Sequence, residues 1–276
     1  MINFYDHKTI LITGSASGIG KRFAEKVADI ADVKLLLWDR NPDELQKLKD
    51  EINDRAEVHI TGIDVTDANL IQLEAEHFIK ENLVPDIIIN CAGIVVGKMF
   101  HEHSFPEIEK SIRINTTGSM WVTRAFLNEM IERGSGQIVN LASASGYIGN
   151  PRMSVYAASK WAVIGWSESL RLEMEKLKTG GGVTAVIPSY IKTGMFDGVK
   201  APILVPLLET DDIVDLMLKG IAARKRTIQA PFMVRLVPLI KAILPYKLFD
   251  WVAGNLLGVY KSMESFEGRT PKSKRS

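Results

Sequence analysis

The chain has 276 residues, 46% of them hydrophobic and 24% charged, so it can bury a sizeable core and is too apolar for wholesale disorder. Its net charge of +1 argues against a nucleic-acid-binding protein, because no strong field attracts phosphate backbones. The single cysteine excludes an internal disulfide and fits a reducing compartment, so we expect a cytoplasmic protein, free or peripherally attached to a membrane.

Short apolar runs alternate with segments of helical spacing along the chain. Residues 1–7 are polar and leave no room for a signal peptide, and no run reaches the ~20 apolar residues of a membrane-spanning helix. Runs that are apolar on both faces are typical of buried parallel strands. The pattern predicts a Rossmann-type doubly wound parallel sheet, α/β class, three layers (α/β/α) and one domain. The expected strands are 8–13, 33–38, 57–63, 84–90, 136–142 and 183–188, and the helices are 19–31, 42–54, 67–82, 106–132 and 155–178.

A glycine-rich turn follows the first expected strand, at residues 13–20 (TGSASGIG). A dinucleotide pyrophosphate needs backbone N–H groups and a helix N-terminus behind them. Gly14 permits the tight turn, Gly18 the approach of the phosphates and Gly20 close helix packing. Such glycines also occur in plain turns, but the preceding strand and following helix favour a cofactor site. Its candidate residues are Gly14, Ser15, Ser17, Gly18, Ile19 and Gly20.

The second expected strand leads into Asp39 and Arg40, about 20 residues beyond the glycines. A carboxylate here can accept hydrogen bonds from the adenosine ribose and repels a 2′-phosphate, which favours NAD over NADP. The neighbouring Arg40 can instead bind that phosphate, so NADP stays open. The alternative for Asp39 is a helix cap or turn residue.

Tyr156 and Lys160 lie one helical turn apart in the expected helix 155–178. A free tyrosine has a pKa near ~10 and is a poor acid–base catalyst at neutral pH. An ammonium about 4 Å away contributes on the order of 4 kcal/mol at an effective dielectric near 20, before desolvation opposes it. We therefore expect a phenol with a lowered pKa. Ser143 follows the fifth expected strand, where a hydroxyl can bind the substrate oxygen.

The chain resembles the short-chain dehydrogenase/reductase family over residues 8 to 230. The resemblance rests on the glycine turn together with Asp64-Val65, Asn90-Cys91-Ala92-Gly93, Asn115, Ser143, Tyr156, Lys160 and Thr193. It implies that Tyr156 is the general acid/base, that Ser143 positions the substrate oxygen and that Lys160 lowers the tyrosine pKa and binds ribose. It also implies that Asn115 holds a water in the proton relay.

The same resemblance completes the cofactor site. It implies that Asp64 and Val65 flank the adenine and that residues 90–93 stiffen the sheet beside the cofactor. Pro188, Ile191 and Thr193, after the sixth expected strand, complete the cofactor-binding set. Two positions depart from the family pattern: Cys91 replaces an asparagine, which we interpret as a packing change, and Ser189 replaces a glycine, so the turn near the nicotinamide can differ in shape.

Further motifs resemble a subgroup of the family that acts on retinoids, steroids and other lipophilic alcohols. They are 90–98 (NCAGIVVGK), 188–190 (PSY), 193–198 (TGMFDG), 244–245 (LP) and 263–266 (MESF). The apolar loop 195–208 suits the lining of a greasy pocket, although it can also simply pack on the core. The expected substrate is a small lipophilic alcohol or its carbonyl, and the expected substrate residues are Ser143, Ser145, Tyr156, Tyr190, Met195 and Phe196.

The composition becomes apolar and rich in proline near residue 230. We divide the chain into a catalytic part (1–230), an apolar helical extension of the same domain (231–266) and a basic flexible tail (267–276). Prolines at 238 and 245 are expected to break the run. Residues 231–260 suit a peripheral membrane patch, a lid over the substrate pocket or a subunit contact.

The sequence also bears on a possible metal site, on the oligomeric state and on alternative functions. His101 and His103 alternate, but no third ligand lies near them in sequence, so we expect no metal site. The segments 106–132 and 155–178 form a dimer interface in the resembling family, which implies a homodimer or homotetramer. Two other functions stay open: an NADPH-dependent 3-oxoacyl reductase, and a non-catalytic protein that senses the cofactor.

Overall fold

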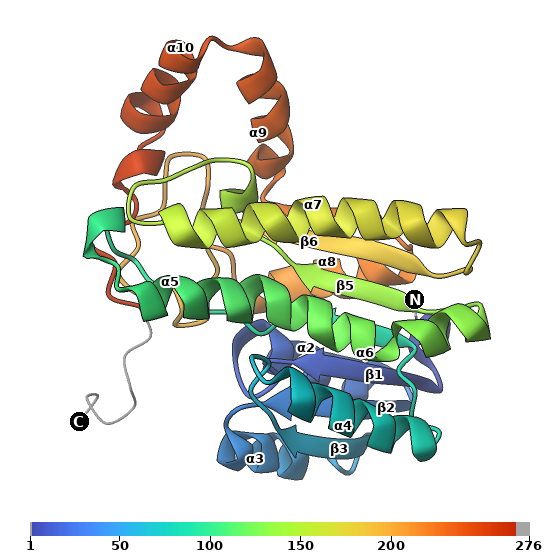
Figure 1. Ribbon diagram of the computed structural model, residues 1–276. Coiled ribbons are helices and arrows are strands. Elements are labelled where there is room, and N and C mark those ends of the chain that lie inside the picture. The colour runs from blue at the N-terminus through green and yellow to red at the C-terminus, as the bar shows by residue number, and fades with distance from the viewer. Residues whose placement is uncertain (1, 269–276) are drawn as a thin grey trace.

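Seven parallel strands form one sheet in the order β3-β2-β1-β4-β5-β6-β7 (Figure 1). The computed structural model describes residues 2–268, so most of the predicted tail, 269–276, lies outside the described residues. The strands are β1 Lys8–Thr13, β2 Val33–Asp39, β3 Glu57–Gly62, β4 Ile87–Asn90, β5 Gln137–Leu141, β6 Gly182–Pro188 and β7 Thr227–Ala230. This order confirms the predicted doubly wound sheet.

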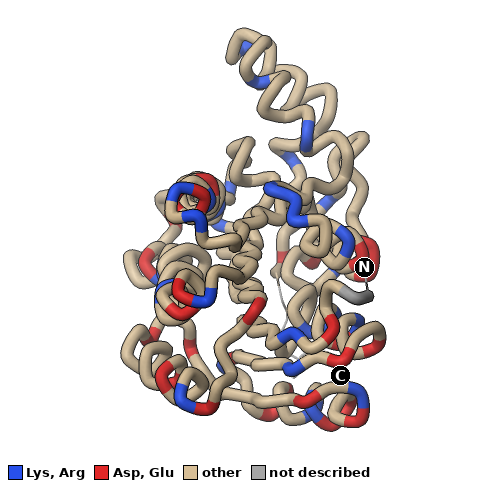
Figure 2. The backbone as a smooth tube through the Cα atoms, turned by 90° about the vertical axis from the view of Figure 1, so that its right-hand side faces the viewer, with Lys and Arg blue, Asp and Glu red and all other residues tan. Residues whose placement is uncertain are grey.

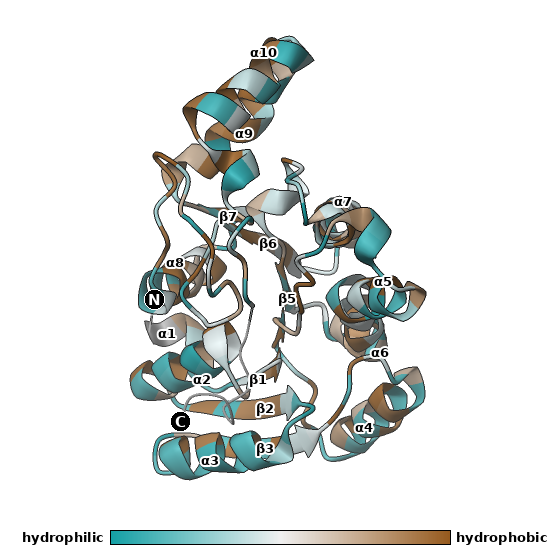
Figure 3. Cartoon of the chain, turned by 90° about the vertical axis from the view of Figure 1, so that its left-hand side faces the viewer, coloured by the Kyte–Doolittle hydropathy of each residue, from teal (hydrophilic) through white to brown (hydrophobic). Residues whose placement is uncertain are grey.

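Helices cover both faces of the sheet, with α2, α3 and α8 on one face and α4 to α7 on the other (Figure 3). The helices are α1 Ile2–Tyr5, α2 Gly18–Ile30, α3 Pro42–Ile52, α4 Ala68–Lys80, α5 Phe105–Ile112, α6 Gly118–Arg133, α7 Ser154–Lys176, α8 Thr210–Ala222, α9 Phe232–Ile243 and α10 Tyr246–Trp251. Short 3-10 or π turns are η1 Phe100–Glu102, η2 Arg113–Thr117, η3 Ala144–Gly146, η4 Val252–Leu256 and η5 Val259–Lys261.

The strands are apolar on both faces because each face packs on a helical layer. Along β1, Ile10 and Ile12 enter the core beneath α2 and α8, whereas Leu11 between them enters the core beneath α4 and α6. In β2, Leu35 and Leu37 alternate in the same way with Leu36. Two cores on either side of one sheet explain why the sequence shows continuous apolar runs here.

The structure differs from the predicted elements in three places. β7 was not predicted, because four residues beginning with an exposed threonine carry little pattern. The predicted helix 106–132 is α5 and α6 joined by the π turn η2. Pro238 does not break the C-terminal run, since it lies inside α9 and only Pro245 separates α9 from α10.

The chain reverses its direction of strand addition between β1 and β4, which are neighbours in the sheet. The Thr13 hydroxyl at the end of β1 accepts hydrogen bonds from the backbone N–H groups of Cys91 and Ala92, at 3.1 and 3.2 Å. These hydrogen bonds hold the ends of β1 and β4 together, and the loops that follow the two strands separate from there. Ligands of doubly wound sheets bind at such a switch point, at the carboxyl ends of the strands.

The α9–α10 hairpin projects beyond the edge of the sheet that β7 forms (Figures 1 and 3). In the part of the chain that the structure describes, no helix is both long enough and apolar enough to traverse a bilayer.

Candidate active site

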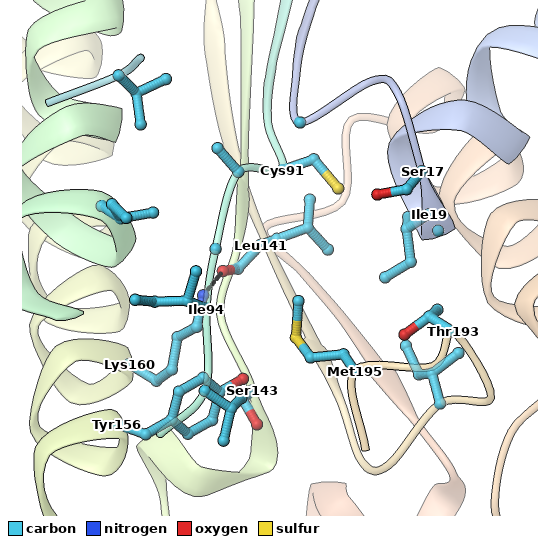
Figure 4. Close-up of a pocket in the computed structure, with 18 of the residues that line it drawn as sticks. Ser17, Ile19, Cys91, Ile94, Leu141, Ser143, Tyr156, Lys160, Thr193 and Met195 are labelled. Carbon is cyan, nitrogen blue, oxygen red and sulfur yellow. Dashed lines mark hydrogen bonds between the residues drawn. The ribbon is translucent and has the colours of Figure 1, made fainter. Parts of the chain in front are cut away.

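A cavity of 340 Å³ lies at the carboxyl ends of the strands, above the switch point (Figure 4). Most of the predicted site residues line it: Gly14, Ser17, Gly18, Ile19, Asp39, Arg40, Asp64, Val65, Ala92, Gly93, Ser143, Tyr156, Lys160, Pro188, Ile191, Thr193, Met195 and Phe196. These residues are spread along the chain from Gly14 to Phe196, so only the fold brings them together.

The glycine turn forms one wall of this cavity and leads into α2. Gly14 has a φ of +67°, and a Cβ at this position would lie 2.8 Å from the Cα of Ala92. At Gly20 a Cβ would lie 2.5 Å from the Gly14 carbonyl oxygen, so the turn packs directly on the helix. The first backbone N–H groups of α2 have no partner within the helix and face an anion-binding position.

The Asp39 carboxylate lies at the end of β2, beside the glycine turn. One oxygen accepts from the Ala16 backbone N–H at 3.1 Å and the other from the Asn41 backbone N–H at 3.0 Å. These bonds fix the carboxylate at the rim of the cavity while Arg40 next to it is exposed. Asp39 is therefore a turn residue whose carboxylate can also accept a hydrogen bond from a ribose hydroxyl.

Tyr156 and Ser143 lie together at the opposite end of the cavity. Tyr156 comes from the first turn of α7 and Ser143 from the end of β5, and Figure 4 shows their hydroxyl groups side by side. The Tyr156 ring packs edge-on against Phe196, with ring centres 6.1 Å apart. Burial raises the pKa of the Tyr156 phenol above its ordinary value, and the hydrogen bond with Ser143 offsets only part of this rise.

Lys160 lies one turn further along α7 and is buried. Its ammonium donates a hydrogen bond of 2.6 Å to the Leu141 carbonyl oxygen and lies 5.7 Å from the centre of the Tyr156 ring. Burial lowers the pKa of Lys160 to about 8, and Cys91 opposes this shift. The expected lowering of the tyrosine pKa by this lysine is not found, because burial raises the pKa of the phenol and the hydrogen bond with Ser143 offsets only part of this rise.

Asn115 is held behind these residues by the π turn η2. Its Oδ1 accepts from the Ile94 N–H at 2.8 Å, and its Nδ2 donates to the Ile94 carbonyl at 3.0 Å and to the Ser159 hydroxyl at 3.1 Å. A Cβ on Gly93 would lie 3.3 Å from Asn115 Oδ1 and 3.8 Å from Lys160 Nζ. The asparagine thus ties the loop after β4 to α7 beside the lysine.

Residues 8–203 match the family model of the short chain dehydrogenases. The chain belongs to this family. It is therefore an oxidoreductase that acts on CH–OH groups with a nicotinamide cofactor. The predicted family, fold and enzyme class are confirmed.

Several known proteins resemble this dehydrogenase over most of its length. Over 270 residues it is 35% identical to epidermal retinol dehydrogenase 2 of Mus musculus, covering 96% of this chain and 86% of that relative. Over 238 residues it is 31% identical to estradiol 17-beta-dehydrogenase 11 of Homo sapiens, covering 86% and 79%. A solved short chain dehydrogenase/reductase from Burkholderia phymatum, in complex with NAD, has a TM-score of 0.76 at 25% identity, covering 89% and 94%. The resemblance to retinoid- and steroid-related members is thus confirmed.

The cavity of the dehydrogenase fits a nicotinamide dinucleotide. The glycine turn leaves no room for side chains where a pyrophosphate approaches the N-terminus of α2. Asp39 lies at one end of the cavity, where it could accept hydrogen bonds from a ribose, and Lys160 and Tyr156 lie at the other end. These groups would hold the cofactor across the switch point.

Six predicted site residues of the dehydrogenase do not line this cavity: Ser15, Gly20, Asn90, Asn115, Ser145 and Tyr190. The Ser15 hydroxyl donates to the Trp38 carbonyl and so supports the turn from behind. Asn90 donates to Thr123 and Asn140, which ties β4 to α6 and β5. Ser15 and Asn90 therefore support the site from behind without reaching the surface of this cavity.

The cavity wall also contains residues that the sequence analysis did not assign to the site: Ile63, Cys91, Ile94, Val95, Ile114, Leu141, Ala142 and Ser189. Each directly precedes or follows a predicted residue or lies within two positions of one, so adjacency was the available signal. Cys91 packs on the core beneath α2, as expected, and burial raises the pKa of its thiol to about 12.

A second, apolar cavity of 110 Å³ adjoins the first at Ser143 and Ser189. Its wall includes the predicted substrate residues Ser145 and Tyr190, and its roof is formed by the loop 202–205, α9 and η4: Pro202, Val205, Met233, Val234, Val237, Ile240, Val252 and Leu257. The loop 195–208 therefore serves both predicted roles, since Leu208 packs on the core while Val205 lines the cavity.

Metal ligands do not converge in the described residues 2–268, where no group of three or more His, Cys, Asp or Glu side chains is arranged to hold an ion.

Proposed function

We propose that the chain is an NAD-dependent dehydrogenase/reductase that interconverts a lipophilic alcohol, of steroid, retinol or long-chain type, with its carbonyl. The observation that carries this proposal is the apolar cavity that opens from Ser143, beside Tyr156 and away from the cofactor cleft. Relatives named for retinol and estradiol support the same substrate class.

The residues divide the chemistry between them. Hydride is carried by the nicotinamide ring when the cofactor is bound. Tyr156 donates a proton to the carbonyl oxygen in reduction and takes it back in oxidation, while Ser143 holds that oxygen next to the phenol. Lys160 stays fixed by Leu141 and holds the ribose, and Asn115 positions the water that links the relay to solvent. Phe196 and the apolar lining of the second cavity would surround the rest of the substrate.

The Asp39 carboxylate is the basis for preferring NAD. We expect Asp39→Asn, which keeps an acceptor and removes the charge, to weaken NADH binding and raise the NADPH-to-NADH affinity ratio about tenfold, since hydrogen bonds to charged groups contribute ~1.5–3 kcal/mol. Fluorescence titration with both reduced cofactors measures the ratio. Arg40→Ala is the matched variant: if it weakens NADPH much more than NADH and the unmodified protein prefers NADPH, the NAD assignment is wrong.

The second cavity is the basis for the substrate class. Val237→Trp fills it from α9, so we expect kcat/KM for a steroid or retinoid alcohol to fall at least ~10-fold while NADH affinity and turnover of a small secondary alcohol persist. Leu239→Trp, two residues away on the exposed face, is the control. Equal losses for large and small alcohols would show that the cavity does not hold the substrate.

The 3-oxoacyl reductase is the second enzymatic reading, supported by Arg40 at the rim. A panel of steroids, retinoids, long-chain alcohols and acyl thioesters, run with both cofactors, separates it from the leading proposal. A sensing protein without turnover has no use for the joint placement of Ser143, Tyr156 and Lys160. No turnover across the whole panel would favour that third reading.

The assembly and location are part of the proposal. The outer face of α7 carries the exposed small residues Ala158, Ala162 and Gly165 at helical spacing, which lets a second copy of α7 approach closely and supports a homodimer or homotetramer. We also propose a cytoplasmic enzyme with peripheral membrane contact through residues 231–260.

A further inference from the structure

We infer that the α9–α10 hairpin docks on an anionic lipid surface and that the lipophilic substrate enters the second cavity from that surface. The inference rests on the proposed function for its substrate class and adds the surface, its partner and the route.

The first observation is that α9 has two neighbouring apolar faces, one over the second cavity and one in solvent. One face, with Met233, Val237 and Ile240, roofs the second cavity. A neighbouring face of the same helix places Phe232, Leu239 and Ile243 in solvent, at spacings of seven and four residues. An apolar helix face is normally buried or in lipid, so the face with Phe232, Leu239 and Ile243 lacks its partner in the isolated chain.

The second observation is that the exposed apolar side chains continue around the tip of the hairpin. Tyr246 is 76% exposed, Ile243 69% and Trp251 55%, and Leu248 and Leu256 are also exposed. Such aromatic residues are enriched where a membrane meets water, because an apolar ring sits beside a polar tip. The hairpin projects beyond the body, so its tip can reach a flat surface without obstruction (Figure 3).

The third observation is the sign of the charge. Between residues 231 and 261 there are four basic side chains, Arg235, Lys241, Lys247 and Lys261, and one acidic side chain, Asp250. Asp250 accepts a hydrogen bond from Tyr260, and Lys241 lies over the Trp161 ring. Arg235 and Lys247 are exposed, and within the described residues neither forms a salt bridge. In Figure 2 the projecting hairpin is largely tan, with blue bands.

This charge selects a lipid surface over a second copy of the chain. A twofold self-contact would place the same basic side chains of two subunits against each other, and like charges across an interface cost affinity. An anionic bilayer instead attracts each exposed Lys or Arg and accepts the apolar tip.

The fourth observation is the position of the cavity. It lies directly beneath α9 and η4 and ends at Ser143, beside Tyr156. The loop that holds Ile203 and Leu204, both exposed, is joined to the residue that directly follows η4 by a hydrogen bond of 2.9 Å from the Ile203 N–H to the Leu257 carbonyl. Exposed apolar side chains therefore lie both on the hairpin and on the loop beside the second cavity, and we infer that a lipid-soluble alcohol enters between them from the bilayer.

The test measures flotation of the full chain with vesicles of phosphatidylcholine alone, and with phosphatidylserine as about one lipid in three. We expect at least about fivefold stronger partitioning to the anionic vesicles. The double variant Leu239→Glu/Ile243→Glu should lose more than tenfold of this binding. Arg235→Gln and Lys247→Gln should each lose about fivefold on anionic vesicles only.

The matched control is Leu73→Glu/Leu216→Glu, which places the same charges at exposed leucines of α4 and α8, and it should float like the unmodified chain. Light scattering of Leu239→Glu/Ile243→Glu tests whether a second copy of the chain covers the hairpin instead of lipid. A shift from oligomer to monomer with vesicle binding unchanged would assign the hairpin to a subunit contact. Absence of vesicle binding by the unmodified chain would also overturn the inference.

Activity on a water-soluble alcohol keeps the two proposals apart. Leu239 and Ile243 line neither cavity, so their variant should keep this activity. Vesicle binding without turnover of any alcohol would reject the proposed function alone, whereas turnover without vesicle binding would reject the docking surface alone.

Discussion

Tyr156→Phe is expected to lose at least ~10²-fold in turnover while binding the cofactor nearly as the unmodified protein does. The substitution removes one oxygen from a buried side chain and keeps the ring that packs on Phe196. The fold and the cleft should therefore persist, and only the proton transfer is lost. Steady-state turnover and NADH fluorescence titration measure the two effects separately.

Tyr190→Phe is the matched control for this prediction. Tyr190 packs on the same Phe196 ring, 5.2 Å between centres, but its hydroxyl contacts Asn150 at 3.0 Å and Ser262 at 2.8 Å instead of Ser143. Its loss should perturb the substrate cavity and lower turnover by less than ~10-fold. If the Tyr156 variant turned over as fast as the Tyr190 variant, Tyr156 would not be the acid–base group.

The parts of the site that the sequence predicted are those encoded by short-range spacing. The glycine turn follows a strand directly, and Tyr156 and Lys160 are one helical turn apart, so local pattern suffices to place them. Alternation of apolar runs and helices predicted the sheet, because both of its faces are covered.

Three features had no local signal. The π turn at Asn115 inserts into an otherwise helical segment, and the apolar pattern of 106–132 reads as one helix with or without it. The second cavity joins side chains from Ser143 to Val259, and a hydrogen-bonded cluster of Asn150, Tyr190 and Ser262 closes its side. Such contacts, across up to 112 residues, follow from the fold and not from neighbouring residues.

The pKa values of Tyr156 and Lys160 depend on burial, which spacing along the chain does not reveal. From spacing, Lys160 should lower the tyrosine pKa, because only its charge can be counted. Burial is invisible at that level, and in the structure it raises the pKa of Tyr156 and lowers that of Lys160. The Lys160 ammonium is thus the group of the pair whose pKa lies nearer to neutral pH.

Lys160→Met is expected to remove a rise in stability with pH. Burial lowers the pKa of Lys160 from 10.5 to about 8 in the folded chain. Between these values the unfolded chain binds a proton on this lysine that the folded chain does not, so the contribution of Lys160 to the free energy of unfolding increases with pH across this window. Below pH 8 both states are protonated and the full cost of burying the ammonium is present, about 3 kcal/mol from the difference between the two pKa values.

Urea unfolding from about pH 7 to pH 9.5 checks this, because that range stays below the ordinary tyrosine pKa and so keeps Tyr156 protonated in both states. The unmodified protein should gain roughly 2 kcal/mol relative to Lys160→Met between about pH 8 and pH 9.5. The difference in slope between the two proteins is the readout, because the buried Cys91 thiol makes stability fall with rising pH in both of them. The variant also loses the hydrogen bond to Leu141, which shifts its stability at every pH. Lys80→Met, at an exposed lysine of α4, should keep the slope of the unmodified protein. Parallel curves for Lys160→Met and the unmodified protein would mean that the buried ammonium holds its proton as firmly as a lysine in water, and that the contact with Leu141 compensates for its burial.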